Sequence, residues 1–162
     1  LVGSEMCIRD RDDVWFEDKI KMAVEKLEHA REDVPVLYFS NYDFYDGDLN
    51  FMAHRDGRTP NISFVNSLVD CVSLGFNSVF NRKAKDMVTE QMPEKSTGHD
   101  WWMYMVCAGM GEVIYDERPT VKYRRHNNNV SDGGYSFITV IHFIIICITE
   151  YSRYRFYCGY SI

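Results

Sequence analysis

The sequence predicts an α/β fold in one domain, because two kinds of segment recur along the 162-residue chain. Some segments carry apolar residues at the spacing of an amphipathic helix. Others are short apolar runs rich in β-branched and aromatic residues, which are typical of strands. Apolar residues make up 46% of the chain and aromatic residues 15%, so the composition is that of a globular protein with a core.

A helical pattern is expected to open at Asp12-Asp13-Val14-Trp15. Its apolar positions are spaced i, i+4, i+8 and i+11, at Phe16, Ile20, Val24 and Leu27. The adjacent carboxylates of Asp12 and Asp13 could cap this helix. They could equally hold a divalent cation, because hard cations take oxygen ligands from carboxylates and phosphates.

The next segments predict a strand, a loop and a second helix. Residues 35–40 are expected to be a buried strand, and residues 41–58 a polar loop with a tight turn at Asp46-Gly47. Thr59-Pro60 would start the helix, as an N-cap followed by a first-turn proline. Its expected apolar face consists of Ile62, Val65, Leu68 and Val69.

Residues 71–80 are expected to be strand on both sides of Gly75, where the backbone would make a close approach. A short helix is then expected after Asn81. Two further strands are expected at residues 113–115 and 119–123, followed by a loop at residues 127–134.

An aromatic-rich helix is expected to begin at His99 and to end at Gly111. Asp100 then lies in the first turn, where unpaired N–H groups and the helix dipole favour a negative charge. The structural interpretation is a capping carboxylate above a buried pair, Trp101 and Trp102. Similarly, Arg124 and His126 at a strand end could bind an anion or form a solvated basic strand end.

Charge and cysteine content exclude some classes of protein. The formal net charge of -6 argues against a nucleic-acid partner, because phosphate contacts need a basic surface. The five cysteines follow no CxxC or CxxH spacing, so we expect reduced thiols and no zinc or disulfide framework.

The two ends of the chain are interpreted separately from its centre. Residues 1–11 resemble the translation of a sequencing adaptor and are not expected to be part of the fold. We therefore expect an N-terminally truncated fragment whose native sequence starts at about Asp12. For the apolar tail at residues 135–162, we favour a shifted reading frame over native protein.

Four motifs occur in an order that resembles bacterial family 2 glycosyltransferases, particularly the rhamnosyltransferase-like group. They are Asp12-Asp13-Val14-Trp15, GFNSVFNR at residues 75–82, His99-Asp100-Trp101-Trp102 and Tyr123-Arg124-Arg125-His126-Asn127-Asn128. The resemblance covers residues 12–134, about the C-terminal half of such a domain. It implies a partial GT-A fold, a Rossmann-like mixed sheet with flanking helices, whose N-terminal nucleotide-binding half is missing.

The resemblance also implies an activity and its partners. An inverting enzyme of this group moves a sugar from a dTDP- or UDP-sugar to a saccharide or lipid-linked acceptor, in cell-surface polysaccharide synthesis. It uses a divalent metal, Mg²⁺ or Mn²⁺. We expect a cytoplasmic protein, peripheral to the inner membrane through its acceptor pathway, and a fragment that is inactive alone.

The resemblance assigns roles residue by residue. Asp100 matches the catalytic base, which takes the proton of the acceptor hydroxyl. Asp12 matches the second carboxylate of a metal-binding Asp-x-Asp motif, and His126 a further metal-binding group. Arg124, His126 and Asp13 are expected to contact the donor diphosphate. Trp101, Trp102, Gly75 and His99 are expected on the acceptor or sugar side.

The sequence departs from the motifs of this family in two places. The first carboxylate of the Asp-x-Asp motif is absent as native sequence. In addition, Phe76-Asn77 follows Gly75, where the family often has Gly-Cys-Thr before its hydrophobic-Phe-Asn element.

Two other hypotheses stand beside the glycosyltransferase. The second hypothesis is a metal-dependent phosphohydrolase that uses His99-Asp100 as a ligand pair. The third is a non-catalytic membrane-surface module organised by the apolar tail.

Overall fold

The computed structural model describes residues 13–55, 59–90, 92 and 98–125, and every structural statement below concerns these residues. They form an α/β structure with a mixed five-stranded sheet flanked by helices, so the predicted fold class is confirmed. In chain order the elements are β1 Val14–Trp15, α1 Lys19–Leu27, β2 Val36–Tyr45, β3 Phe51–His54, α2 Phe64–Ser67, the 3₁₀ helix η2 Gly75–Asn77, β4 Ser78–Phe80, α3 Arg82–Glu90, α4 His99–Met110 and β5 Glu112–Arg124.

Strand β2 is the centre of the sheet, whose order is β1-β5-β2-β3. Strand β5 runs parallel to β2, whereas β3 and β4 pair antiparallel with its two halves. The first eight residues of β2 are buried. A parallel pair needs a long crossover, and the chain between β2 and β5 supplies α2, α3 and α4 for it.

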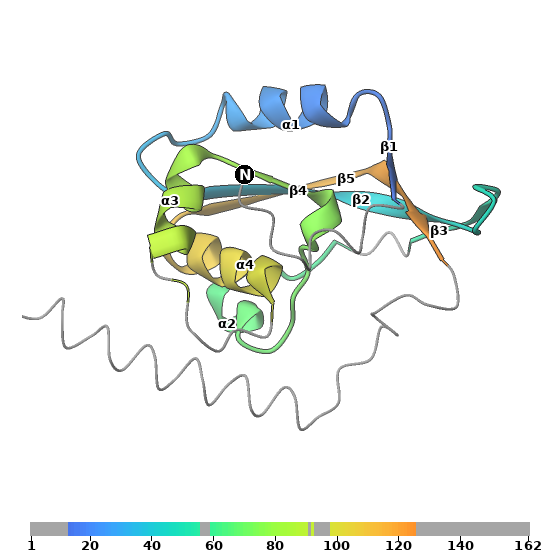
Figure 1. Cartoon of the computed structure of the whole chain (residues 1–162). Helices are drawn as coiled ribbons and strands as arrows, with labels where there is room; N and C mark the ends of the chain where they lie inside the picture. Colours follow the sequence, from blue (N-terminus) through green and yellow to red (C-terminus); the bar gives the residue numbers. More distant parts are fainter. Residues whose placement is uncertain (1–12, 56–58, 91, 93–97, 126–162) are drawn as a thin grey trace, which may run out of the picture.

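The helices cover the sheet in layers. Figure 1 shows α1 on one face, and α4 with the short α2 on the other. The larger core cluster lies between the sheet and helices α3 and α4. Its buried members are Leu37, Phe39, Val72, Ala84, Val88, Met103, Tyr104, Val106 and Cys107. This core fixes α4, the helix that begins with His99 and Asp100.

Helix α4 has the predicted bounds, and Gly111 ends it as expected. Gly111 is needed because a Cβ there would lie 1.8 Å from the carbonyl oxygen of Pro35. The same carbonyl accepts the N–H of Glu112 at 3.0 Å, at the start of β5. The close packing of these two chain segments therefore leaves no room for a side chain.

Strand β5 is one continuous strand, so the prediction of two separate strands at residues 113–115 and 119–123 is wrong. An irregularity in pairing replaces the expected break: Asp116 pairs with Ser40, and Pro119 pairs with the next residue, Asn41. Proline has no N–H to donate to a sheet. Asp116 stabilises the bulge by accepting hydrogen bonds from the side chain of Arg118, the shorter at 2.7 Å.

Within the polar loop expected at residues 41–58, residues 41–54 are instead the second half of β2, a tight turn and β3. The turn itself is where it was predicted, because Asp46 Oδ1 accepts the N–H groups of Asp48 and Asn50 at 2.9 and 2.8 Å. The polar residues Asn41 and Asp43 interrupt the apolar pattern that predicts a strand. Both are buried within the sheet.

The first helix starts later than expected and buries a different face. Val14–Trp15 is strand β1, paired with β5, and α1 begins at Lys19. Its buried residues are Lys19, Met22 and Ala23, whereas Ile20 and Val24 are 48% and 43% exposed. Sheet pairing with a strand more than a hundred residues away outweighed the local helical pattern.

The segment from Thr59 to Phe80 is less regular than predicted. Ser63, and not Thr59, caps α2: its Oγ accepts the N–H of Asn66 at 3.1 Å. Val65, which was expected on the apolar face, is 73% exposed. In residues 71–80 only Ser78–Phe80 is strand, while the short helix expected after Asn81 is present as α3.

Candidate active site

Asp100 lies in the first turn of α4, with its side chain partly exposed. Its Oδ1 accepts the backbone N–H of Trp101 at 2.9 Å. Its Oδ2 accepts the N–H of Gly75 at 3.3 Å, which joins the helix to η2. Each carboxylate oxygen has two lone pairs, so both keep capacity to accept a further proton donor. The carboxylate is thus oriented by two backbone groups and remains accessible.

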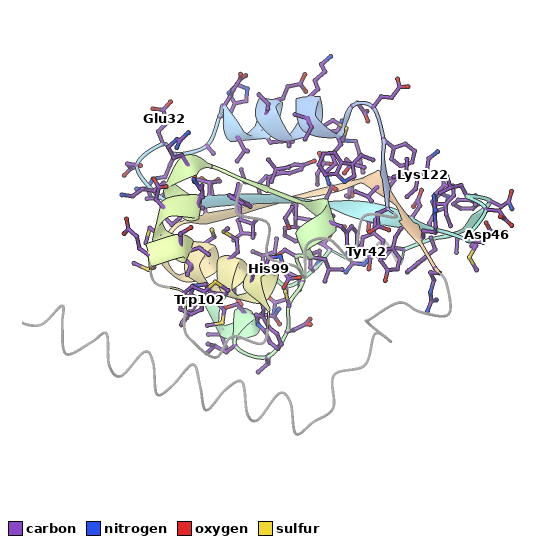
Figure 2. The ribbon with its side chains drawn as sticks, in the orientation of Figure 1. Glu32, Tyr42, Asp46, His99, Trp102 and Lys122 are labelled. Carbon is purple, nitrogen blue, oxygen red and sulfur yellow. The ribbon has the colours of Figure 1, made fainter. Side chains whose placement is uncertain are left out.

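Gly75 and Gly98 both lie close to this carboxylate. A Cβ at Gly75 would lie 3.2 Å from Nε2 of His99, and one at Gly98 would lie 2.7 Å from Oδ1 of Asp100. The close approach predicted at Gly75 is therefore confirmed, and its partners are the first residues of α4. Figure 2 shows His99 at the end of α4 that faces Tyr42, with Trp102 farther along the helix.

The two tryptophans lie in different surroundings. Trp101 is 2% exposed, and its Nε1 donates to the carbonyl oxygen of Ser67 at 2.6 Å. Its ring packs with Met105 in a second, smaller core cluster. The interpretation of Trp101 as a buried core residue is therefore confirmed. Trp102 is half-buried and packs against both core clusters. Trp101 therefore anchors α4 from within the core and offers no surface to a sugar in this structure.

A second group of predicted residues lies where β1 pairs with β5. Asp13 Oδ1 accepts the backbone N–H of Arg124 at 3.0 Å. Two residues that lie 111 positions apart in sequence are thus in contact, as a shared anion site would require. The two residues assigned to metal binding, Asp12 and His126, lie outside the described residues.

The helix η2 connects the two groups. Phe76 stacks on Tyr123 with a centroid distance of 5.0 Å and an interplanar angle of 27°, and it meets Tyr42 edge-on at 5.0 Å. Asn77 is fully buried: its Nδ2 donates to the carbonyl oxygen of Ser40, and its Oδ1 accepts the N–H of Leu74 at 3.0 Å. The turn that carries Gly75 is therefore fixed to both central strands.

Sequence reasoning missed the residues that hold this turn. Phe76 and Asn77 are part of the GFNSVFNR motif, but their partners on β2 and β5 cannot be found by spacing. Lys19 was also missed. It is 1% exposed, donates a hydrogen bond to the carbonyl oxygen of Phe76, and places Nζ 4.2 Å from the centroid of the Trp15 ring.

Burial lowers the pKa of Lys19 to about 8, although the nearby carboxylate of Asp13 acts in the opposite direction. The Asp13 carboxylate is therefore near enough to the Lys19 ammonium group to interact with it electrostatically. The buried cation thus lies between strand β1, which follows Asp13, and the turn that carries Gly75.

Other surface features lie away from Asp100. One shallow hollow is lined by residues around Asp116 and Arg118, and another by Val14, Trp15 and Lys122 among others. Within the part of the chain that the structure describes, no three histidine, cysteine or carboxylate side chains are grouped to hold a metal ion. His54 is paired with a single carboxylate, since its Nδ1 lies 3.0 Å from Oδ1 of Asp43.

Comparison with curated proteins shows a distant similarity to the dTDP-rhamnosyl transferase RfbG of Shigella flexneri, 26% identical over 145 residues. The match covers 82% of this chain and 46% of that protein, so the chain spans about half the length of its curated relative. Such coverage includes the whole span from Gly75 to Arg124. The similarity supports a relationship to glycosyltransferases.

No family model matches the chain, and no solved structure matches it. In the described ranges, no helix is both long and apolar enough to cross a membrane.

Proposed function

We propose that the chain is part of an inverting glycosyltransferase that moves a sugar from a nucleotide-diphosphate donor to a saccharide or lipid-linked acceptor. The observation that carries this proposal is the accessible carboxylate of Asp100, oriented by the N–H groups of Trp101 and Gly75. The similarity to a dTDP-rhamnosyl transferase, which covers 82% of this chain, supports it.

Asp100 acts as the general base. An acceptor hydroxyl donates a hydrogen bond to the carboxylate and loses its proton to it as the hydroxyl oxygen attacks the anomeric carbon. The bond from that carbon to the diphosphate oxygen breaks on the opposite face of the sugar, which inverts the configuration. The contact of Asp100 with Gly75 keeps the carboxylate in one orientation while the reaction proceeds.

Asp13 and Arg124 form the donor side. The cationic side chain of Arg124 suits the negative charge that develops on the leaving diphosphate. Asp12 is the sequence neighbour of Asp13, and His126 follows Arg124 by two positions, so both residues assigned to the metal adjoin this contact in the sequence. The carboxylate oxygens fit a hard cation such as Mg²⁺ or Mn²⁺, which when bound would neutralise the diphosphate.

Gly75, His99 and Trp102 form the acceptor or sugar side in this proposal. Gly75 and His99 are exposed beside Asp100, and Trp102 is half-buried one turn into the same helix. Trp101 supports the site from the core through its bond to Ser67. We propose that the protein is cytoplasmic and reaches a lipid-linked acceptor at the inner membrane.

Acceptor-dependent release of the nucleotide tests this function. The product of the complete gene is incubated with dTDP- or UDP-sugars and Mg²⁺ or Mn²⁺, and nucleoside diphosphate is measured with and without a saccharide acceptor. A transferase releases diphosphate mainly when the acceptor is present. Release of inorganic phosphate without an acceptor would instead support the phosphohydrolase hypothesis and contradict the proposal.

A further inference from the structure

The turn that carries Gly75 is held by four different elements. Asn77 ties it to β2 through the carbonyl oxygen of Ser40, and Phe76 stacks on Tyr123 of β5. The N–H of Gly75 reaches Asp100 of α4. The fourth tie comes from α1, where Lys19 donates to the carbonyl oxygen of Phe76.

The tie from Lys19 differs from the others because it buries a charge. An ammonium group taken out of water is costly unless its partners compensate for the lost hydration. Lys19 is 1% exposed, and burial is the main influence on its pKa, which falls to about 8. A long apolar side chain would fill the same space without this cost. Stability alone therefore does not explain a lysine at this position.

The position of Lys19 suggests what the charge does. Its Nζ contacts the Phe76 carbonyl on one side and lies over the ring of Trp15 in β1 on another. The carboxylate of Asp13, next to β1, interacts electrostatically with it. One side chain thus contacts both the donor-side strand and the turn whose N–H orients Asp100.

We propose that Lys19 is a positioning residue, which couples strand β1, next to Asp13, to the Gly75–Asn77 turn and so sets the orientation of Asp100. The role in turnover rests on the proposed glycosyltransferase function. The coupling of strand and turn does not, because it concerns the placement of the backbone alone.

Hydrogen exchange measures the coupling without any assay of activity. In the product of the complete gene, Lys19→Met should raise the exchange rate of the amides of residues 75–78 by about tenfold, with the centre of α4 unchanged. Two controls on the same helix separate other causes. Lys21→Met removes an exposed charge, and Met22→Ala removes a buried apolar side chain. Neither control variant should raise the amide exchange rate of residues 75–78 selectively.

Kinetics then tests the effect on Asp100. Lys19→Met should lower kcat by about 10- to 100-fold with a small change in the KM for donor, because misplacement of a catalytic group slows the chemical step. Lys19→Arg, which can still donate to the Phe76 carbonyl, should recover most of the rate. The Met22→Ala control shows how much of the loss follows from weaker packing alone.

The outcomes are separable. Faster amide exchange confined to the turn, together with a lower kcat, in Lys19→Met supports the proposal. Unchanged exchange in the turn, or global unfolding of Lys19→Met, overturns it, since Lys19 would then have no local role or a purely structural one. If the unmodified protein shows no transfer, the proposed function fails, and the exchange result still decides whether Lys19 couples strand and turn.

Discussion

Single residues around Asp100 fix the orientation of its partly exposed carboxylate. The N–H groups of Trp101 and Gly75 hold its two oxygens, and Gly98 leaves room for one of them. The backbone of Gly98 is extended, with φ of 179°, which any residue can adopt. A glycine at this position is therefore explained by the space that Asp100 occupies and not by backbone strain.

Gly98→Ala should move the Asp100 carboxylate, because the new Cβ would lie 2.7 Å from Oδ1. We expect kcat to fall about tenfold or more, since small displacements of a reacting group are costly. The free energy of unfolding should change by less than about 1 kcal/mol, because the displaced atoms belong to a partly exposed side chain. Steady-state kinetics and urea unfolding measure both. A normal kcat would show that the present orientation of the carboxylate is not needed.

At the scale of elements, the sequence predicts those segments whose pattern is decided locally. The bounds of α4, the beginning of β2 and the helix after Asn81 follow from apolar spacing and from a helix stop at Gly111. The elements that were missed depend on distant partners. Strand β1 exists because it pairs with β5, and the second half of β2 is strand although it contains the polar Asn41 and Asp43.

The candidate site, like the fold, could be predicted from the sequence only in part. Motifs identified Gly75, Asp100 and Arg124, but not the contacts that join Gly75 to Asp100 or Asp13 to Arg124. The burial of Lys19 could not be predicted, because a lysine on an amphipathic helix is usually solvated. Trp101 showed the limit of motif reasoning, since core packing and a binding role have the same sequence signature.

Gly111→Ala should destabilise the junction between α4 and β5. A Cβ 1.8 Å from the carbonyl oxygen of Pro35 forces the backbone apart, and overpacking of this kind costs about 2–3 kcal/mol. Urea unfolding measures the loss. Gly47→Ala is the matched control, because nothing lies within 4 Å of its added Cβ and the change should stay within about 0.5 kcal/mol. Equal stability of the two variants would contradict the close packing of Gly111 on Pro35.

At the scale of the whole molecule, the buried Lys19 makes stability depend on pH. Its pKa is about 8 in the folded protein and 10.5 as its ordinary value, so between these pH values the unfolded state binds more protons. Stability therefore rises with pH across this window. Burial raises the pKa of Tyr42, which acts in the opposite direction above about pH 10.

The difference between the unmodified protein and Lys19→Met isolates this contribution, because the tyrosines are common to both. From pH 8 to pH 10 the free energy of unfolding of the unmodified protein should rise relative to the variant by about 2 kcal/mol. Urea unfolding at a series of pH values measures it. A difference that is flat with pH would show that Lys19 is solvated in the folded protein.

The most direct measurement compares turnover and donor binding in Asp100→Asn, in the product of the complete gene. Asparagine keeps the size of the side chain but cannot accept the hydroxyl proton, so turnover should fall by about a thousandfold or more. The Kd for the nucleotide-sugar, measured by calorimetry with Mg²⁺, should change little, since Asp100 is assigned to the acceptor hydroxyl. Asp86→Asn, an exposed position on α3, should behave as the unmodified protein. Turnover retained in Asp100→Asn would contradict the assignment of Asp100 as the base.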